Sequence, residues 1–126
     1  MAKILLIEDQ SFTATIIETV LKKAGHIVTV AKDGERGLAA FDADRPDVVI
    51  TDILLPGMDG LEVIREIQSR VPGFPVVALT GGGKTGLYDY LDKARALGAV
   101  DVFRKPVTAE QLLGAIARCM DLNPSS

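Results

Sequence analysis

Short apolar runs alternate along this chain with longer amphipathic stretches, and this pattern predicts strands that alternate with helices. The runs at residues 3–7, 46–51 and 74–80 are almost continuously apolar, as is typical of central parallel strands that helices cover on both faces. The runs near residues 27–30 and 101–104 also carry polar side chains. We therefore expect these two runs at the edges of one sheet.

The amphipathic stretches predict five helices. Their expected ranges are residues 11–24, from near Asp33 to just before Pro46, from Asp59 to just before Pro72, from about Leu87 to Gly98, and from Thr108 to about Met120. In the first helix, one apolar stripe is predicted to face the core, and it consists of Phe12, Ile16, Val20 and Leu21.

Several residues give signals for the helix ends. Gly25 is expected to end the first helix in the left-handed conformation, which glycine adopts without steric cost. Asp59 is expected to cap the third helix at its N-terminus. Thr108 and Gln111 have the spacing of a capping box, so the fifth helix should begin there.

This order of elements predicts an α/β fold of the flavodoxin-like type. It is a doubly wound, five-stranded parallel sheet in the order 2-1-3-4-5, with helices on both faces. The 126 residues suit one domain, expected over residues 1–122, with residues 123–126 as a C-terminal tail.

Composition narrows the classes of function. The formal net charge is −3 and no Lys/Arg cluster occurs, so direct binding to nucleic acid is not expected. No run approaches the roughly 20 apolar residues of a membrane span and nothing resembles a secretory signal, so we expect a cytoplasmic protein. Cys119 is the only cysteine, which excludes an internal disulfide and favours a small core residue over a reactive thiol.

Reactive polar residues follow four of the predicted strands. Glu8 and Asp9 follow the first strand, Asp52 ends the third, Thr80 ends the fourth and Lys105 follows the fifth. In a doubly wound sheet, ligands bind beyond the carboxyl ends of the strands. The function is therefore expected at this edge.

The three carboxylates predict a cation site. They repel one another unless a cation compensates their charge, and Mg²⁺ prefers oxygen ligands of this kind. Asp9 and Asp52 are expected as direct ligands, with Glu8 acting through a water molecule. The alternative is that Glu8 and Asp9 only cap the first helix and Asp52 a turn.

Taken together, five motifs in this order resemble the response-regulator receiver domain of two-component signalling, over nearly the whole chain. The motifs are Ile7-Glu8-Asp9, the segment from Asp52 through Pro56-Gly57 to Asp59-Gly60, Thr80, Gly98-Ala99, and Lys105-Pro106. The resemblance is to the stand-alone, chemotaxis-regulator-like type, which implies a chain without an output domain of its own.

The resemblance implies that Asp52 is the nucleophile that takes a phosphoryl group from a phosphohistidine. Glu8 and Asp9 would hold Mg²⁺, and Asp52 and the backbone carbonyl of Leu54 would complete its protein ligands. Such chemistry depends mainly on positioning and on neutralising the charge of the phosphoryl oxygens. The protein would be a signalling phosphoprotein that catalyses its own phosphorylation and dephosphorylation, not a classical enzyme.

The remaining site residues and the partners also follow from the resemblance. Lys105 would contact the phosphoryl oxygens, Thr80 would donate its hydroxyl to them, and the bond from Lys105 to Pro106 would be cis. The implied partners are a sensor histidine kinase or a histidine phosphotransfer protein, and a downstream protein target. The sequence does not choose between protein binding and phosphorelay.

The chain departs from the family at two places. The family carries an aromatic residue three positions before the lysine, where this chain has Val102; Phe103 is its neighbour and should point to the opposite face of the sheet. The segment from Gly81 to Gly86 is unusually rich in glycine, which favours a hinge or partner-binding loop as much as a plain connector. Tyr88 and Tyr90 are candidates for an interface or for packing.

Three alternatives stay open at this point. The segment from Ala78 to Thr85 is close to a phosphate-binding loop of nucleotide-binding enzymes, although Ala78 stands where the first glycine belongs. A flavin-binding protein could share the topology, but Glu8 and Asp9 would repel the flavin phosphate. A degenerate receiver that only binds partners is the third alternative.

Overall fold

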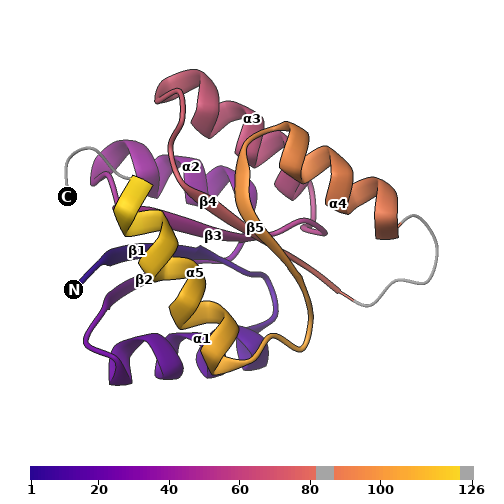
Figure 1. Cartoon of the computed structure of the whole chain (residues 1–126). Coiled ribbons are helices and arrows are strands. Elements are labelled where there is room, and N and C mark those ends of the chain that lie inside the picture. The colour runs from indigo at the N-terminus through magenta and orange to yellow at the C-terminus, as the bar shows by residue number, and fades with distance from the viewer. Residues whose placement is uncertain (82–86, 123–126) are drawn as a thin grey trace.

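A computed structural model describes residues 1–81 and 87–122, with side chains from Tyr90 onward in the second range. Five strands alternate with five helices in the described part of the chain (Figure 1). In chain order the elements are β1 (Lys3–Ile7), α1 (Ser11–Lys23), β2 (Ile27–Ala31), α2 (Gly34–Ala43), β3 (Val48–Asp52), α3 (Gly60–Arg70), β4 (Val76–Thr80), α4 (Leu87–Ala96), β5 (Ala99–Arg104) and α5 (Ala109–Leu122).

The strands form one parallel sheet in the order β2-β1-β3-β4-β5, which confirms the predicted fold class and both edge strands. The register of β1, β3 and β4 places Ile7 opposite Thr51 and Asp52 opposite Leu79. The carboxyl ends of β1, β3 and β4 therefore lie side by side. Predicted strand starts at residues 46 and 74 were early, because β3 and β4 begin at Val48 and Val76.

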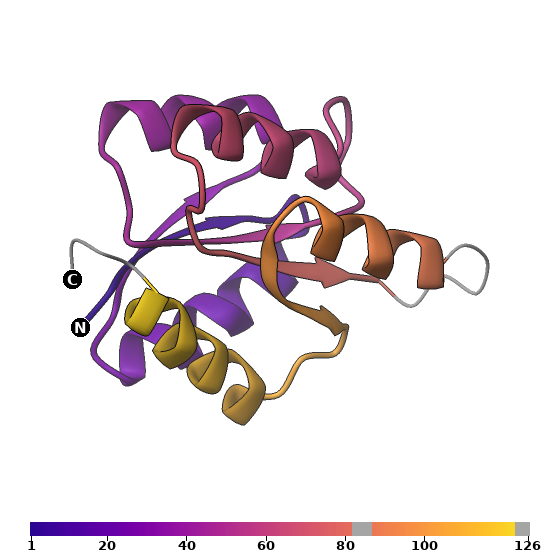
Figure 2. The same ribbon diagram turned by 45° about the horizontal axis from the view of Figure 1, so that its top comes forward.

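Helices cover both faces of the sheet, and each face has its own apolar core (Figure 2). One core lies against α2, α3 and α4 and includes Phe41, Ile64 and Ile67. The other lies against α1 and α5 and includes Leu21, Ile116 and Cys119. The burial of Cys119 confirms that this cysteine is a core residue, and burial raises the pKa of its thiol to about 12.

The predicted signals at helix ends are confirmed. Gly25 has a φ of +93°, in the left-handed region. Asp59 accepts a hydrogen bond from the backbone N–H of Glu62 at 2.9 Å. Thr108 and Gln111 exchange two side-chain to backbone bonds at 2.9 and 3.0 Å, which makes the capping box.

The predicted inward stripe of α1 is wrong at two positions. Phe12 and Ile16 are 77% and 51% exposed, whereas the buried residues of this helix are Ala14, Ile17 and Leu21. The helix has two apolar stripes, and the one with the small Ala14 faces the sheet because it lets the helix approach closely. Two large apolar side chains are therefore left on the surface of α1.

Val102 and Phe103 point to opposite faces of β5, as predicted. Val102 is buried in the core under α2, α3 and α4, and Phe103 packs against the core under α1 and α5. Tyr90 is partly buried against the Val102 side, which makes it a packing residue. The side chain of Tyr88 lies outside the described residues, and so does the segment from Gly82 to Gly86.

No helix in the described part of the chain is both long and apolar enough to cross a lipid bilayer. The cytoplasmic location stays a prediction.

Candidate functional site

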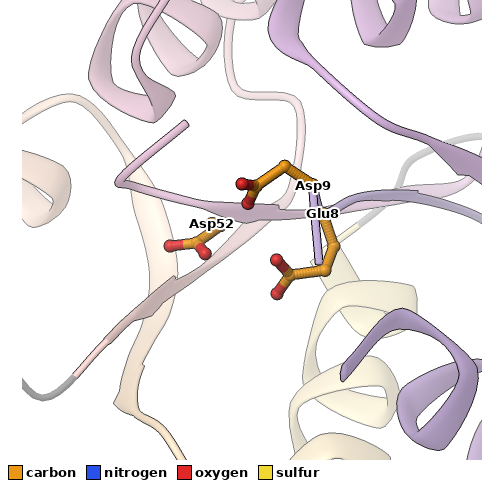
Figure 3. A group of neighbouring side chains, drawn as sticks. All are labelled: Glu8, Asp9 and Asp52. Atoms are coloured by element: carbon orange, nitrogen blue, oxygen red, sulfur yellow. The ribbon is translucent and has the colours of Figure 1, made fainter. Parts of the chain in front are cut away.

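Three carboxylates meet beyond the carboxyl ends of β1 and β3 (Figure 3). Glu8 and Asp9 follow β1, and Asp52 is the last residue of β3. One oxygen atom from each carboxylate lies within 4.8 Å of one oxygen of each of the others. The sheet order thus brings together acids that are more than forty positions apart in the sequence, as predicted.

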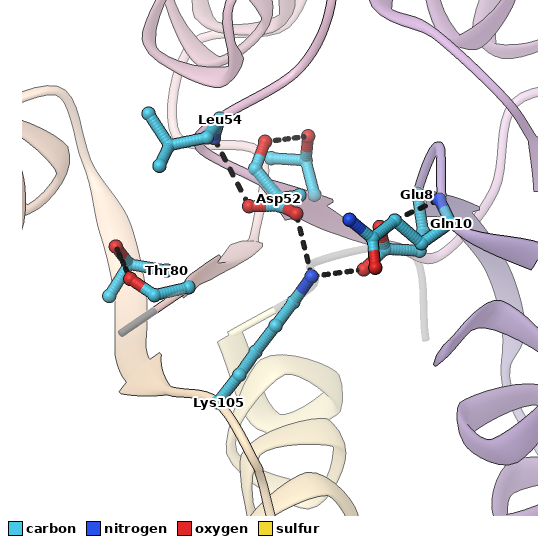
Figure 4. Close-up of polar contacts among 8 residues, drawn as sticks. Glu8, Gln10, Asp52, Leu54, Thr80 and Lys105 are labelled. Atoms are coloured by element: carbon cyan, nitrogen blue, oxygen red, sulfur yellow. Dashed lines mark hydrogen bonds and ion pairs between the residues drawn. The ribbon is translucent and has the colours of Figure 1, made fainter. Parts of the chain in front are cut away.

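The ammonium group of Lys105 lies between two of these acids (Figure 4). Lys105 Nζ donates one hydrogen bond to Glu8 Oε1 and another, at 2.6 Å, to Asp52 Oδ2. The backbone N–H of Lys105 also donates to the carbonyl oxygen of Thr80 at 2.8 Å, which ties the segment after β5 to the end of β4. The peptide bond from Lys105 to Pro106 is cis, as the resemblance implied.

Backbone amides occupy the other oxygen of each buried acid. Asp52 Oδ1 accepts a hydrogen bond from the N–H of Leu54, and Glu8 Oε2 accepts one from the N–H of Gln10, each at 3.1 Å. The capping alternative is thus realised only in part, because Gln10 is the N-cap of α1 and makes no side-chain cap bond. Within residues 1–81 and 87–122, no hydrogen bond or ion pair engages the carboxylate of Asp9.

Burial and charge set the electrostatics of this cluster. Burial raises the pKa of the Glu8 carboxyl, although the hydrogen bonds from Lys105 and Gln10 oppose this effect. Burial alone would lower the pKa of Lys105, but its hydrogen bonds to Asp52 and Glu8 raise it above its usual value. The ammonium therefore stays charged at neutral pH.

The donor set fits a hard divalent cation. Three carboxylates and one ammonium have a formal charge of −3 + 1 = −2, which a divalent cation would neutralise. All the oxygen donors lie at one edge of the sheet, and Asp9 brings a carboxylate without a protein partner among the described residues. Mg²⁺ is usually held by one or two carboxylates together with water and phosphate oxygens, so this cluster suits it.

Thr80 is near the cluster but its hydroxyl is directed elsewhere. The residue is buried at the end of β4, and its hydroxyl donates to the carbonyl oxygen of Gly81 at 3.3 Å. Figure 4 shows this bond apart from the contacts of Lys105, Asp52 and Glu8. The structure thus brings together four of the five predicted polar side chains, and Thr80 reaches them only through its backbone.

Gly60 supports the site for a reason that the sequence did not reveal. A Cβ atom at this position would lie 2.1 Å from the backbone oxygen of Asp52 and 2.5 Å from Cα of Ile53. The N–H of Gly60 also donates to the carbonyl oxygen of Ile53 at 2.7 Å. Glycine thus lets the start of α3 pack directly against the backbone that carries Asp52.

A groove of about 320 Å³ opens next to the cluster, between α1 and the segment after β5, and is here called the α1 groove. Its lining includes Phe12, Ile16, Lys105, Pro106 and Val107. Sequence reasoning missed this surface because it assigned Phe12 and Ile16 to the core. The presence of these two large apolar residues near the start of the helix was the signal in the sequence that could have indicated a surface groove.

Comparison with known proteins identifies relatives along nearly the whole chain. The sequence is 39% identical over 114 residues to the transcriptional regulatory protein AfsQ1 of Streptomyces coelicolor, covering 89% of this chain and 48% of that protein. It is 32% identical over 120 residues to the chemotaxis protein CheY of Listeria monocytogenes, covering 94% of this chain and 98% of that protein. The chain thus spans about half the length of several curated relatives.

Solved structures agree with these relatives. A response regulator receiver domain protein from Clostridium thermocellum superposes with a TM-score of 0.88 at 36% identity, covering 96% of this chain and 95% of that one. The chemotaxis response regulator CheY4 of Vibrio cholerae gives a TM-score of 0.82 at 29% identity, with coverages of 94% and 98%. These likenesses favour a phosphoacceptor over the nucleotide-binding and flavin alternatives. Residues 4–117 match the response regulator receiver domain, and the chain belongs to this family of two-component signalling proteins.

Proposed function

We propose that this chain is a phosphorylation-controlled switch whose phosphoacceptor is Asp52. The observation that carries the proposal is the convergence of the Glu8, Asp9 and Asp52 carboxylates within 4.8 Å, with the ammonium of Lys105 on Asp52 Oδ2. The donor is a phosphohistidine of a sensor histidine kinase or of a histidine phosphotransfer protein. The receiver then acts by binding a downstream protein or by passing the phosphoryl group on.

The transfer is a displacement at phosphorus. A carboxylate oxygen of Asp52 forms the new P–O bond while the P–N bond to the donor imidazole breaks, and the imidazole nitrogen keeps the electron pair and takes up a proton. Mg²⁺, when bound, neutralises charge on the phosphoryl oxygens. Asp9, Asp52 and the carbonyl of Leu54 would hold it directly, and Glu8 through a water molecule.

Lys105 and Thr80 have complementary roles in this proposal. The ammonium of Lys105 is already within hydrogen-bond distance of Asp52, so it can stabilise the phosphoryl oxygens during transfer. The hydroxyl of Thr80 has to turn from the carbonyl of Gly81 to reach the new aspartyl phosphate. That reorientation would report the phosphorylated state to the neighbouring surface.

The α1 groove supports docking of the phosphodonor. Lys105 contributes both to this groove and to the acidic cluster, so a protein seated there lies next to Asp52. Phe12 and Ile16 offer apolar area that an amphipathic helix carrying the phosphohistidine would cover. Exposed side chains of this size at one site are typical of interaction surfaces.

The same residues would let the chain catalyse its own phosphorylation and dephosphorylation. We propose residues 1–122 as the functional receiver unit. If so, a small phosphodonor can replace the partner protein, because the metal ligands, the lysine and the nucleophile all belong to this chain.

A labelling experiment tests the proposal. The full chain is incubated with a small acyl phosphate, with Mg²⁺ or with a chelator, and its intact mass is measured. We expect one added phosphoryl group only with Mg²⁺, and none in Asp52→Asn. Asp59→Asn is the matched control, since the carboxylate of Asp59 caps α3 and is not one of the three that form the cluster. Labelling that persists in Asp52→Asn, or that ignores the metal, would overturn the proposal.

A further inference from the structure

We infer that the outer side of β2 is a self-association surface, through which two copies of this chain join their sheets by antiparallel pairing of their β2 strands around Thr29. Within residues 1–81 and 87–122, β2 is the last strand on its side of the sheet and pairs only with β1 (Figure 1). The outer side of such a strand presents backbone N–H and C=O groups to which another strand can bind. No residue of the carboxylate cluster belongs to β2, so this inference does not depend on the proposed function.

The pairing with β1 determines which backbone groups of β2 point outward. The N–H of Ile27 donates to the carbonyl oxygen of Ala2 at 3.0 Å, so the backbone groups of Ile27 face β1. The direction of these groups alternates from one residue to the next along a strand, so those of Thr29 also face β1. Val28 and Val30 therefore direct two N–H and two C=O groups to the outer side of β2.

A two-fold axis at Thr29 pairs all of these outward groups. In an antiparallel pair, directly opposite residues alternate between those that exchange two hydrogen bonds and those that exchange none. When Thr29 lies opposite Thr29 of the second copy as a pair without hydrogen bonds, Val28 lies opposite Val30 of the second copy. Each of the two symmetric valine pairs then exchanges two bonds, so every outward group of both strands has a partner.

The side chains of β2 suit the same register. The strand reads Ile27-Val28-Thr29-Val30-Ala31, which is nearly palindromic about Thr29. The axis thus places valine opposite valine, threonine opposite threonine, and the large Ile27 opposite the small Ala31. Pairs of β-branched residues and Thr–Thr pairs across two strands stabilise antiparallel pairing. Ile27 is 49% exposed and Thr29 is exposed as well, so both side chains are accessible for these contacts.

The other edge strand, β5, is protected against such pairing. It carries Asp101 and Arg104, and its pairing with β4 has a register irregularity. Charged side chains and irregular strands are common features that keep exposed edge strands from pairing with other chains. In contrast, β2 has neither a charged residue nor a proline between His26 and Lys32, and its pairing with β1 is regular. Of the two edge strands, β2 is therefore the one that is open to a second copy.

The size of this surface predicts a weak, reversible dimer. The five residues of β2, at about 3.3 Å each, give a strip about 17 Å long and about 10 Å wide. This corresponds to about 170 Å² per copy, well below the roughly 800 Å² per partner of a stable interface. Antiparallel pairing places the carboxyl ends of the strands of the two copies at opposite ends of the joined sheet, so both carboxylate clusters stay open.

Sedimentation equilibrium of the full chain at about 10 µM to 1 mM tests the association. We expect the average mass to rise with concentration from that of the monomer toward that of the dimer. Thr29→Lys places two ammonium groups opposite each other at the two-fold axis and should raise the dissociation constant at least about tenfold. Thr19→Lys, which changes an exposed threonine of α1, is the matched control and should leave it unchanged. Circular dichroism checks that both variants are folded.

A cysteine at the axis tests the register. In an antiparallel pair without hydrogen bonds the Cα atoms lie about 4.5 Å apart, which a disulfide can span. Thr29→Cys should therefore form a disulfide-linked dimer under mild oxidation. Ile27→Cys is the matched control, because the two cysteines would be four residues out of register, about 13 Å apart and beyond the reach of a disulfide. Cys119 is buried, so the parent chain should not cross-link.

Two results would overturn the inference. One is a parent chain that stays monomeric up to about 1 mM, which would leave this surface to an extended segment of another protein or to no partner. The other is an Ile27→Cys variant that cross-links as fast as Thr29→Cys, which would indicate a different register or random encounters. Labelling of Asp52 in Thr29→Lys should match that of the parent chain, so a failure of the dimer is distinguishable from a failure of the proposed function.

Discussion

The strands of the sheet begin at one edge, here called the amino edge, and end at the other, the carboxyl edge. Each of these edges contains a lysine paired with a carboxylate, but one pair is exposed to solvent and the other is buried. At the amino edge, Lys3 Nζ lies 2.6 Å from Asp44 Oδ1, and the two side chains are 38% and 75% exposed. At the carboxyl edge, Lys105 is 18% exposed, and the side chains of its partners Glu8 and Asp52 are 0% and 6% exposed. The same chemical pairing is thus solvated at one edge and buried at the other.

This difference in burial indicates where the fold uses charge for function. An exposed pair contributes little to stability, with a median of about 0–1 kcal/mol. Buried charges lose hydration, and their attraction often does no more than offset that loss. Buried acids are therefore a costly way to stabilise a domain, and their concentration at the carboxyl edge marks this edge as the place of chemistry.

Neutralising the lysine at each edge gives the largest contrast. We expect Lys105→Met to lower the free energy of unfolding by about 3 kcal/mol in metal-free buffer, because it leaves two buried carboxylates without their cation. Lys3→Met should cost less than about 0.5 kcal/mol. Urea unfolding measures both, and equal losses would show that burial does not distinguish the two edges.

Adding metal should act only on the carboxyl edge. Mg²⁺ at about 100 times its dissociation constant is expected to raise the free energy of unfolding by about 2.7 kcal/mol. Asp9→Asn should lose about half of this gain or more at the same Mg²⁺ concentration, whereas Asp44→Asn at the amino edge should keep it. Thermal unfolding with Mg²⁺ and with a chelator provides the comparison, and a gain that survives in Asp9→Asn would argue against the cation site.

Alanine substitutions at Gly60 and Gly114 compare tight packing next to the site with ordinary packing within α5. Gly60→Ala should cost about 2 kcal/mol, since its Cβ would overlap the backbone that carries Asp52. Gly114→Ala places its Cβ 3.5 Å from Arg118 Nη1, an ordinary contact within α5, and should stabilise by up to about 1 kcal/mol. Chemical denaturation of both variants tests the signs, and a neutral Gly60→Ala would remove the claim of close packing.

The smallest expected effect is a pH dependence at the amino edge. His26 Nδ1 accepts the N–H of Ala2 at 3.0 Å. Burial, and then the nearby N-terminal ammonium, hold the pKa of His26 below its ordinary value of 6.5. The neutral form is thus favoured in the folded state, so its contribution is complete above pH 6.5 and is lost as the pH falls through the lowered pKa.

His26→Asn keeps an acceptor for Ala2 but does not titrate. The difference in unfolding free energy between the parent chain and this variant should shift by less than about 1 kcal/mol as the pH falls, the scale of one neutral hydrogen bond. Urea unfolding at several pH values measures the shift. The contribution of Glu8 to the pH dependence is the same in both proteins, so it drops out of the difference. Parallel pH profiles would contradict the expectation.

Much of the architecture was predictable because it depends on local pattern. Continuous apolar runs identified the central strands, and short-range cap signals such as Asp59 and the Thr108–Gln111 pair placed helix starts. Once the strand order was assumed, the positions of Glu8, Asp9 and Asp52 after parallel strands implied that they meet. Residue position was enough for that step.

The parts that the sequence did not predict depend on distances across the fold. The pairing of Lys105 with Glu8 joins the loops after β5 and β1, and no local signal encodes it. The contact of Gly60 with the backbone of Asp52 likewise depends on how the folded chain brings the two together, and no local pattern shows it. Helix α1 offered two apolar stripes, and only the packing around Ala14 decides between them.

The most direct test of the account is the chemical identity of the phosphorylated residue. After labelling with a small acyl phosphate and Mg²⁺, borohydride reduction converts an aspartyl phosphate into homoserine, which peptide sequencing by mass spectrometry locates. We predict homoserine at position 52 and at no other acid of the chain. Homoserine at position 9 or 59, or a phosphoryl group that survives reduction on a hydroxyl side chain, would contradict the account.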